Sequence, residues 1–149
     1  MNIKGKYYCS RCLAPLPDET VCLYCGHDPE ERYDSHLMEE GTLLSDQRYR
    51  VGVVITEDNW YCCYGGWDYW KGKPVLIKEL FPKKLISRDI LVSDNVVIPS
   101  GREKEYAEVL KQYINMGYRG VCTPAIIDAF YCNGFGYHIF DYGNMLDRI

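Results

Sequence analysis

The sequence lacks three features that would place it in a common class of protein. It has no run of about eighteen apolar residues, so no membrane-spanning helix is expected. Basic residues do not predominate: 17 Lys and Arg against 21 Asp and Glu give a net charge of -4, which disfavours a general nucleic-acid binder. Residues 1–6 lack the apolar core of a signal peptide. We therefore expect a cytoplasmic protein that contacts neither membranes nor nucleic acid.

The composition is that of a folded protein. Hydrophobic residues make up 47% and aromatic residues 14% of 149 residues, enough for one modest domain with a small appendage. Eight cysteines are many for this length. In a reducing compartment they are more often metal ligands or free thiols than disulfides.

Four of these cysteines form a pattern. Cys9 and Cys12 make one CxxC pair, Cys22 and Cys25 make a second, and nine residues separate the pairs. Two such pairs converging on one ion offer four thiolates, which suits tetrahedral Zn²⁺; a rubredoxin-like iron site would use the same geometry. With four sulfur ligands no position is open to water, so the metal would be structural. We expect His27 to be a surface residue and not a ligand.

The chain divides into three parts in this interpretation. Residues 1–28 form a zinc ribbon, and residues 29–41 form an acidic linker without regular structure, in which His36 is solvated. Residues 42–149 form the larger domain. Because a polar linker transmits little strain, the two folded parts are expected to be independent of each other.

The larger domain begins with a predicted three-stranded antiparallel meander. Residues 49–56 and 60–64 are rich in Val, Ile and Tyr and flank a turn at 57–59. The third strand lies within 74–82, a short apolar run between prolines that contains Lys78. A lone lysine in a strand usually points to solvent, since a buried ammonium is costly without a partner.

One helix and a hairpin are expected to follow. Residues 100–116 carry a single apolar stripe after an S-x-x-E capping box at Ser100 and Glu103, and Gly117 can end the helix. Strands at 125–132 and 135–142 flank an Asn-Gly turn. Less regular patterns predict a small hairpin at 90–98 and the start of a helix at 145–149. Among the remaining residues of interest, His138 is expected to be structural, Cys62 and Cys63 to face opposite sides of a strand, and Cys122 and Cys132 to be small core residues.

These elements, in this order, resemble the small lobe of a protein kinase. The motifs that support the resemblance are Arg48-Tyr49-Arg50-Val51-Gly52, Gly66-Trp67-Asp68, Val75-Leu76-Ile77-Lys78-Glu79-Leu80-Phe81-Pro82, Ile86-Ser87-Arg88-Asp89, Ile127-Asp128-Ala129-Phe130, Asn133-Gly134 and Phe140-Asp141-Tyr142. They are similar to those of a bacterial group of serine/threonine kinases in which a zinc ribbon precedes the kinase domain. The resemblance implies an α+β fold: an N-terminal zinc ribbon followed by a five-stranded antiparallel sheet with one main helix. It also implies that Lys78, Asp141 and Tyr142 would bind nucleotide.

The phosphate-binding features of that family are missing. The three glycines of its phosphate-covering loop fall on Thr56, Asp58 and Tyr61, where side chains would block close backbone approach to phosphate. Glu57 and Asp58 would place negative charge beside a triphosphate. The sequence contains neither a His-Arg-Asp catalytic loop nor an Asp-Phe-Gly metal site, on whose positioning phosphoryl transfer depends.

The helix also departs from the family. The glutamate that should pair with Lys78 falls on Lys111, and Glu108 lies one turn away. We therefore expect a non-catalytic, zinc-binding, pseudokinase-like interaction module that has no catalytic residue and binds ATP weakly or not at all. A protein partner or a second copy would cover the side that a large lobe normally covers, which includes residues 100–116 and Tyr142. The alternative is the N-terminal ATP-binding part of a split or truncated kinase that needs a large lobe in trans.

Overall fold

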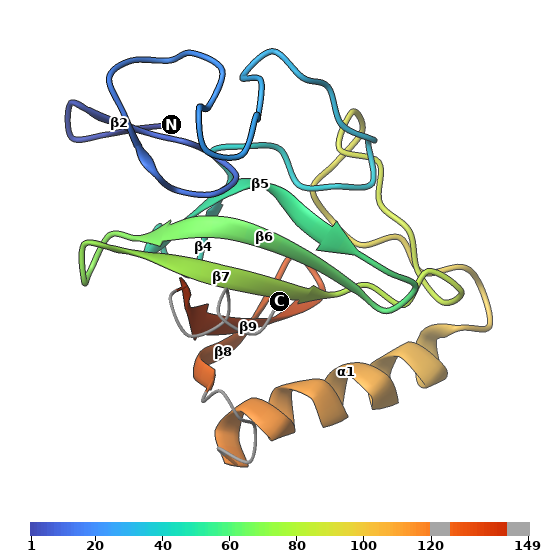
Figure 1. Cartoon of the computed structure of the whole chain (residues 1–149). Helices are drawn as coiled ribbons and strands as arrows, with labels where there is room; N and C mark the ends of the chain where they lie inside the picture. Colours follow the sequence, from blue (N-terminus) through green and yellow to red (C-terminus); the bar gives the residue numbers. More distant parts are fainter. Residues whose placement is uncertain (120–125, 143–149) are drawn as a thin grey trace.

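The described residues form two antiparallel sheets and one helix, as expected for an α+β fold (Figure 1). The structure, a computed structural model, describes residues 1–119 and 126–142. A three-stranded sheet of order β1-β2-β3 belongs to residues 1–28, here called the N-terminal unit. Its strands are β1 (Asn2–Ile3), β2 (Lys6–Tyr8) and β3 (Pro15–Leu16). Within the described residues, no helix combines the length and apolarity needed to cross a bilayer.

The larger sheet has six strands in the order β4-β5-β6-β7-β9-β8, not the predicted five. The sixth is β4, which pairs antiparallel with β5. It forms because Ser45, Asp46 and Gln47 all adopt left-handed backbone angles and turn the chain tightly. The strands are β4 (Leu43–Leu44), β5 (Tyr49–Glu57), β6 (Tyr61–Asp68), β7 (Lys73–Leu80), β8 (Ile126–Cys132) and β9 (Phe135–Asp141).

Helix α1 (Glu103–Arg119) presents the predicted stripe to the sheet. Its start is later than expected, because the Glu103 carboxylate accepts the N–H of Gly101 and leaves Ser100 outside the helix. Gly117 does not end the helix; a Cβ there would collide with Ala129 of β8, so glycine allows a close crossing. The stripe residues Tyr106, Tyr113 and Ile114 are buried, and Val109 and Leu110 are half-buried.

The C-terminal hairpin has the predicted turn. Asn133 and Gly134 both have positive φ, as a two-residue turn between twisted strands requires. The hairpin predicted at 90–98 is wrong, since this region contributes only an isolated bridge between Ser87 and Val97. The helix predicted at 145–149 and Cys122 lie outside the described residues.

Side-chain alternation gives the large sheet two faces, and both are covered. The Glu79 face consists of Tyr64, Ile77, Glu79 and Tyr137, and it packs against Leu37 and Met38 of the supposed linker. The Lys78 face consists of Trp67, Leu76, Lys78, His138 and Phe140. Figure 1 shows the N-terminal unit over β5 and β6 at one end of the twisted sheet and α1 beside β8 and β9 at the other.

Candidate metal centre and the Lys78 face

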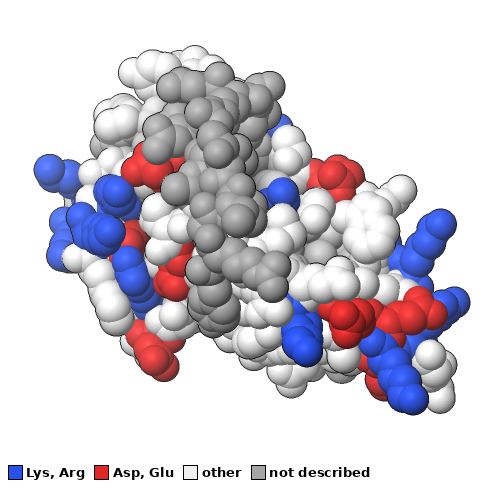
Figure 2. All heavy atoms as spheres, turned by 90° about the horizontal axis from the view of Figure 1, so that it is seen from below, with Lys and Arg blue, Asp and Glu red and all other residues white. Residues whose placement is uncertain are grey.

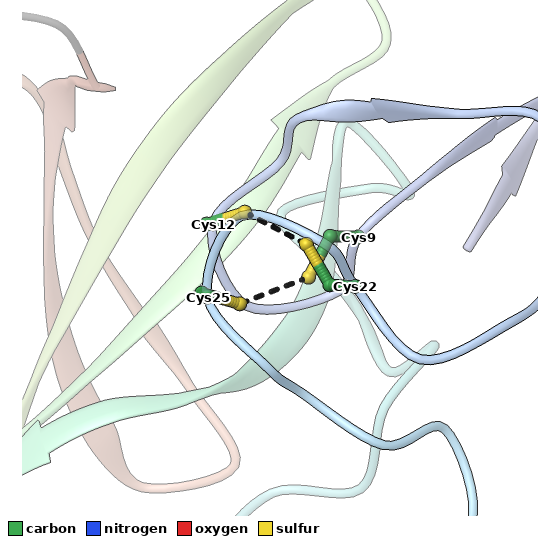
Figure 3. A group of neighbouring side chains, drawn as sticks. All are labelled: Cys9, Cys12, Cys22 and Cys25. Carbon is green, nitrogen blue, oxygen red and sulfur yellow. Dashed lines mark hydrogen bonds between the residues drawn. The ribbon is translucent and has the colours of Figure 1, made fainter.

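The four predicted cysteine ligands converge (Figure 3). Their sulfur atoms all lie within 4.8 Å of one another. The Sγ–Sγ distances are 3.5 Å for Cys9 and Cys25 and 3.6 Å for Cys12 and Cys22. Tetrahedral Zn²⁺ with Zn–S bonds of about 2.3 Å requires sulfurs about 3.8 Å apart. The cluster is therefore compatible with zinc.

The two CxxC segments repeat one backbone geometry. The N–H of Arg11 points to Cys9 Sγ at 3.4 Å, and the N–H of Tyr24 points to Cys22 Sγ at 3.3 Å. Each segment then closes on a residue with positive φ, Leu13 in the first and Gly26 in the second. The sequence indicated the second turn through its glycine, but it gave no signal for Leu13.

The thiols respond differently to their surroundings. Burial raises the pKa of Cys9 and of Cys12. Burial acts in the same direction on Cys22, but the backbone N–H groups of Cys25 and Tyr24 outweigh it and lower the pKa of Cys22 to about 7. A bound cation would favour the thiolate form at all four positions.

His27 is buried, so its prediction as a surface residue is wrong. Its Nδ1 lies 3.1 Å from the hydroxyl of Tyr33, and its carbonyl accepts the N–H of Cys22 at 2.9 Å. Through its carbonyl, His27 therefore stabilises the turn that contains Cys22 and Cys25.

The first cysteine turn is hydrogen-bonded to the large sheet. The carbonyl of Ser10 accepts the N–H of Val53 at an irregularity in β5, at 2.8 Å. A Cβ at Gly52 would collide with that carbonyl oxygen, and one at Gly65 would press on the carbonyl of Arg11. Glycine in both strands thus allows the turn to lie directly on the Lys78 face.

Apolar side chains complete this contact. Ring centroids of Tyr8 and Trp67 lie 5.0 Å apart. The hydroxyl of Tyr142 donates to the carbonyl of Cys12 at 2.6 Å. The N-terminal unit and the sheet therefore share one apolar cluster, contrary to the expected independence of the two parts. Its buried members are Met1, Ile3, Leu13, Trp67, Leu76, Phe140 and Tyr142.

Lys78 lies half-buried in the middle of β7, beside this cluster. Its Nζ lies 4.1 Å from the ring centroid of Tyr61, and among the described residues no carboxylate is within ion-pair distance of it. Tyr113 is the helix residue that reaches this strand, through a 2.7 Å hydrogen bond from its hydroxyl to the Lys78 carbonyl. Lys111 is exposed, and Glu108 accepts a hydrogen bond from Gln112.

The structure places the three residues predicted to bind nucleotide at separate positions, on β7, on β9 and directly after β9. Asp141 lies opposite Val75, three residues along β7 from Lys78, or about 10 Å. Asp141 also forms a 3.0 Å ion pair with Lys73. Tyr142 is buried against the N-terminal unit. Each residue thus has a local partner of its own.

In the kinase resemblance, the acidic residues Glu57 and Asp58 would lie near phosphate. In the structure, their side chains make local contacts instead. Asp58 Oδ1 accepts the N–H groups of Trp60 and Tyr61 at 2.8 and 2.9 Å, which closes the β5–β6 hairpin. Glu57 pairs with His36 at 2.9 Å and with Lys83 at 3.4 Å. His36 is therefore held against β5 and is not simply solvated.

A buried ionic network on the Glu79 face was not predicted from the sequence. The Glu79 carboxylate is fully buried and accepts two 2.8 Å hydrogen bonds from Arg88 and one of 2.6 Å from the Tyr137 hydroxyl. Arg88 also donates to the carbonyl of His36 at 2.9 and 2.7 Å. The network ties residues 36–38 to the sheet. The only sequence signal was a second charge, Glu79, within an apolar run.

His138 is structural, as predicted. It is buried, its ring stacks on Tyr113 at 3.6 Å between centroids, and its Nε2 donates to the Tyr113 carbonyl at 2.6 Å. Burial, helped by the positive charge of Lys78, lowers the pKa of His138 to about 4, although the hydrogen bond opposes this shift. The imidazole is therefore neutral at pH 7.

Comparison with known proteins gives similarity in structure but not in sequence. No protein-family model and no curated protein sequence matches the chain. One solved structure that aligns with this chain is the PpkA-294 apo form, which is a kinase-related chain. The alignment covers 72% of this chain, with 17% identity and a TM-score of 0.58. The alignment spans 39% of that chain. The protein thus has a fold similar to part of a kinase-related structure.

Proposed function

We propose that this protein is a non-catalytic, zinc-binding, pseudokinase-like module for protein interaction. Cys9, Cys12, Cys22 and Cys25 would hold the Zn²⁺. A structural Zn²⁺ with four thiolates fixes the two cysteine turns and leaves no position for a reacting group. The convergence of the four sulfur atoms supports this assignment.

One observation carries the non-catalytic part of the proposal. The N-terminal unit packs on Leu76, Phe140 and Tyr142. The kinase resemblance would place adenine on this surface, between the apolar strands and the residues near Tyr142. The Tyr142 hydroxyl is bonded to Cys12 there. A nucleotide would have to displace this apolar contact before it could bind.

The phosphate side of the same face supports the proposal. Lys78 offers one cation there, and Asp58 adds a negative charge in the β5–β6 turn, whereas the Glu57 side chain lies on the opposite face of the sheet. At about 4 Å, each contact between like charges costs a few kcal/mol at an effective dielectric near 20.

Of the surface expected from the sequence to meet a partner, Tyr142 is buried, whereas part of the helix remains accessible. A protein partner or a second copy would meet α1 where it borders the segments around Trp60 and Pro82. There a groove of about 600 Å³ is lined by Trp60, Pro82, Leu85 and Val109, among others, and Trp60 is half-exposed. Figure 2 shows acidic and basic side chains interspersed on this side, outside the grey residues, which disfavours nucleic acid as the partner.

A second candidate function is the ATP-binding part of a kinase completed in trans. Two observations favour it. Lys78 projects from the central strand without a carboxylate partner among the described residues, and the fold resembles 39% of a kinase-related chain.

Calorimetry with Mg-ATP separates the two candidates. For the interaction module we expect no dissociation constant tighter than high micromolar, roughly above 100 μM, and no phosphate transfer. A dissociation constant below about 10 μM, abolished by Lys78→Ala but kept by Lys104→Ala on the exposed side of α1, would favour the second candidate.

A further inference from the structure

A second group of metal-ligating side chains lies apart from the four cysteines. His36, Glu57 and Cys62 each direct one donor atom to a common point, and these three atoms lie within 4.8 Å of one another. Glu57 and Cys62 are directly opposite on β5 and β6, so their side chains share the Glu79 face. His36 reaches the same point from the segment before β4, with Nε2 2.9 Å from Glu57 Oε2.

The surroundings fix these donors in place. Arg88 holds the His36 carbonyl with two hydrogen bonds and is itself paired with the fully buried Glu79. The imidazole edge rests on the ring of Phe81, 5.7 Å between centroids. Such outer contacts orient metal ligands and reduce the cost of assembling a site.

The donor set defines the class of ligand. We propose that His36, Glu57 and Cys62 bind one divalent transition-metal ion such as Zn²⁺. A tetrahedral ion with bonds of about 2.0–2.3 Å needs donors about 3.3–3.8 Å apart, a distance that small side-chain rotations can reach from the observed triangle. Imidazole nitrogen, carboxylate oxygen and thiolate sulfur are all zinc ligands.

The charge and the solvent exposure of the three ligands determine how the site could bind a metal ion. Binding replaces the proton of the Cys62 thiol with the metal and releases that proton to solvent, so thiolate and carboxylate together neutralise the divalent ion. Cys62 is fully buried, whereas the side chains of His36 and Glu57 are 25% and 32% exposed. Three protein ligands with one solvent-facing side leave a coordination position open to water or to a partner's side chain, unlike the four-cysteine centre.

Lys83 is a second charged partner of Glu57. Its Nζ lies 3.4 Å from Oε1, while Oε2 faces His36. The two carboxylate oxygens thus have separate roles, and the lysine leaves Oε2 available to the metal.

Cobalt titration of the full chain tests the proposal. The chain first receives one equivalent of Zn²⁺ to fill the four-cysteine centre, and Co²⁺ is then added. We expect a further equivalent to bind, with a thiolate-to-cobalt charge-transfer band and visible ligand-field bands. Cys62→Ser should remove the charge-transfer band and weaken binding by at least about 10–100-fold.

Matched variants keep the outcome interpretable. Cys63→Ser removes the neighbouring thiol, which faces the other side of the sheet, and should leave the cobalt spectrum unchanged. His36→Ala removes a partly exposed ligand without opening the core, so it serves if Cys62→Ser does not fold. No cobalt binding beyond the first metal, or a spectrum unchanged in both Cys62→Ser and His36→Ala, would show an ordinary His–Glu ion pair and overturn the proposal.

Discussion

The two faces of the large sheet differ in how a charged side chain is accommodated, although Lys78 and Glu79 are neighbours on one strand. On the Glu79 face the carboxylate is fully buried and completely paired, and it anchors residues 36–38 through Arg88. On the Lys78 face the ammonium rests on the ring of Tyr61, and apolar residues of the N-terminal unit cover the part that contains Trp67, Leu76 and Phe140. The ionic interactions of the Glu79 face therefore maintain the structure, and much of the Lys78 face is covered by apolar packing.

The difference shows where each face depends on the rest of the chain. The Glu79 face is held by groups within the large sheet and its flanking segments. The Lys78 face is held by a unit whose own shape relies on four cysteines. Perturbing the metal should therefore open one face and leave the other closed.

Removing the metal should have the largest effect. Cys12→Ser should unfold residues 1–28, since metal binding supplies roughly 10–16 kcal/mol in comparable small zinc units. Amides of β7 and β9 should then exchange faster with solvent, while the sheet stays folded around the Glu79 face. Hydrogen exchange measures this. Cys63→Ser is the control, and unchanged exchange in β7 and β9 would mean that the faces do not differ in this way.

Breaking the buried pair should destabilise the other face. Arg88→Ala leaves Glu79 buried without its partner, which typically costs about 3–5 kcal/mol of the free energy of unfolding. Arg102→Ala, which breaks an exposed pair with Glu105, should cost less than about 1 kcal/mol. Chemical denaturation of both variants checks this. Equal losses would remove the proposed distinction.

Acid should weaken the Lys78 face through His138. Its pKa is about 4 in the fold, against about 6.5 for an unperturbed histidine, so between these pH values the unfolded chain binds a proton that the folded chain does not. The free energy of unfolding should therefore fall by about 3 kcal/mol from pH 7 to pH 4, and by only about a few tenths of a kcal/mol more below pH 4.

The variant His138→Gln isolates this contribution, since it keeps a hydrogen-bond donor but cannot titrate. Its stability should depend less on pH over this window. Glu57 and Asp68, whose pKa values are lowered in the fold, lose their stabilising effect as the pH falls below about 5, but both residues are present in the variant and in the parent chain, so their contribution cancels in the difference. Identical pH profiles for the variant and the parent chain would contradict the assignment.

Loosening the contact between the units should have the smallest effect. Tyr142→Phe removes the hydrogen bond to the Cys12 carbonyl and should cost about 1–2 kcal/mol. Tyr131→Phe, at an exposed position on β8, should change stability by less than about 0.5 kcal/mol. Thermal unfolding of the two variants makes the comparison.

The features that could be predicted from the sequence are those that depend on a local pattern of residues. Cysteine spacing predicted the four-sulfur cluster, the Asn-Gly pair predicted the C-terminal turn, and a 3.6-residue stripe predicted the face of α1. Each signal lies within a few neighbouring residues. Their spacing alone determines the geometry.

Packing between distant segments was not predictable in this way. Strand β7 is covered on both faces, so alternation could not show that Glu79, and not Lys78, is the fully buried charge. Arg88 comes from a segment without regular structure. The contact between Tyr142 and Cys12 joins residues 130 positions apart, and no periodicity encodes such a contact.

The central claim is that the N-terminal unit lies on the Lys78 face, and one measurement tests it most directly. Nuclear Overhauser effects between ring protons of Tyr8 and indole protons of Trp67, whose centroids lie 5.0 Å apart, report this contact in solution. We expect these signals in the metal-loaded chain and their loss on chelation. A folded, metal-loaded chain without them, in which the two parts tumble independently, would contradict the claim and leave the Lys78 face open to nucleotide.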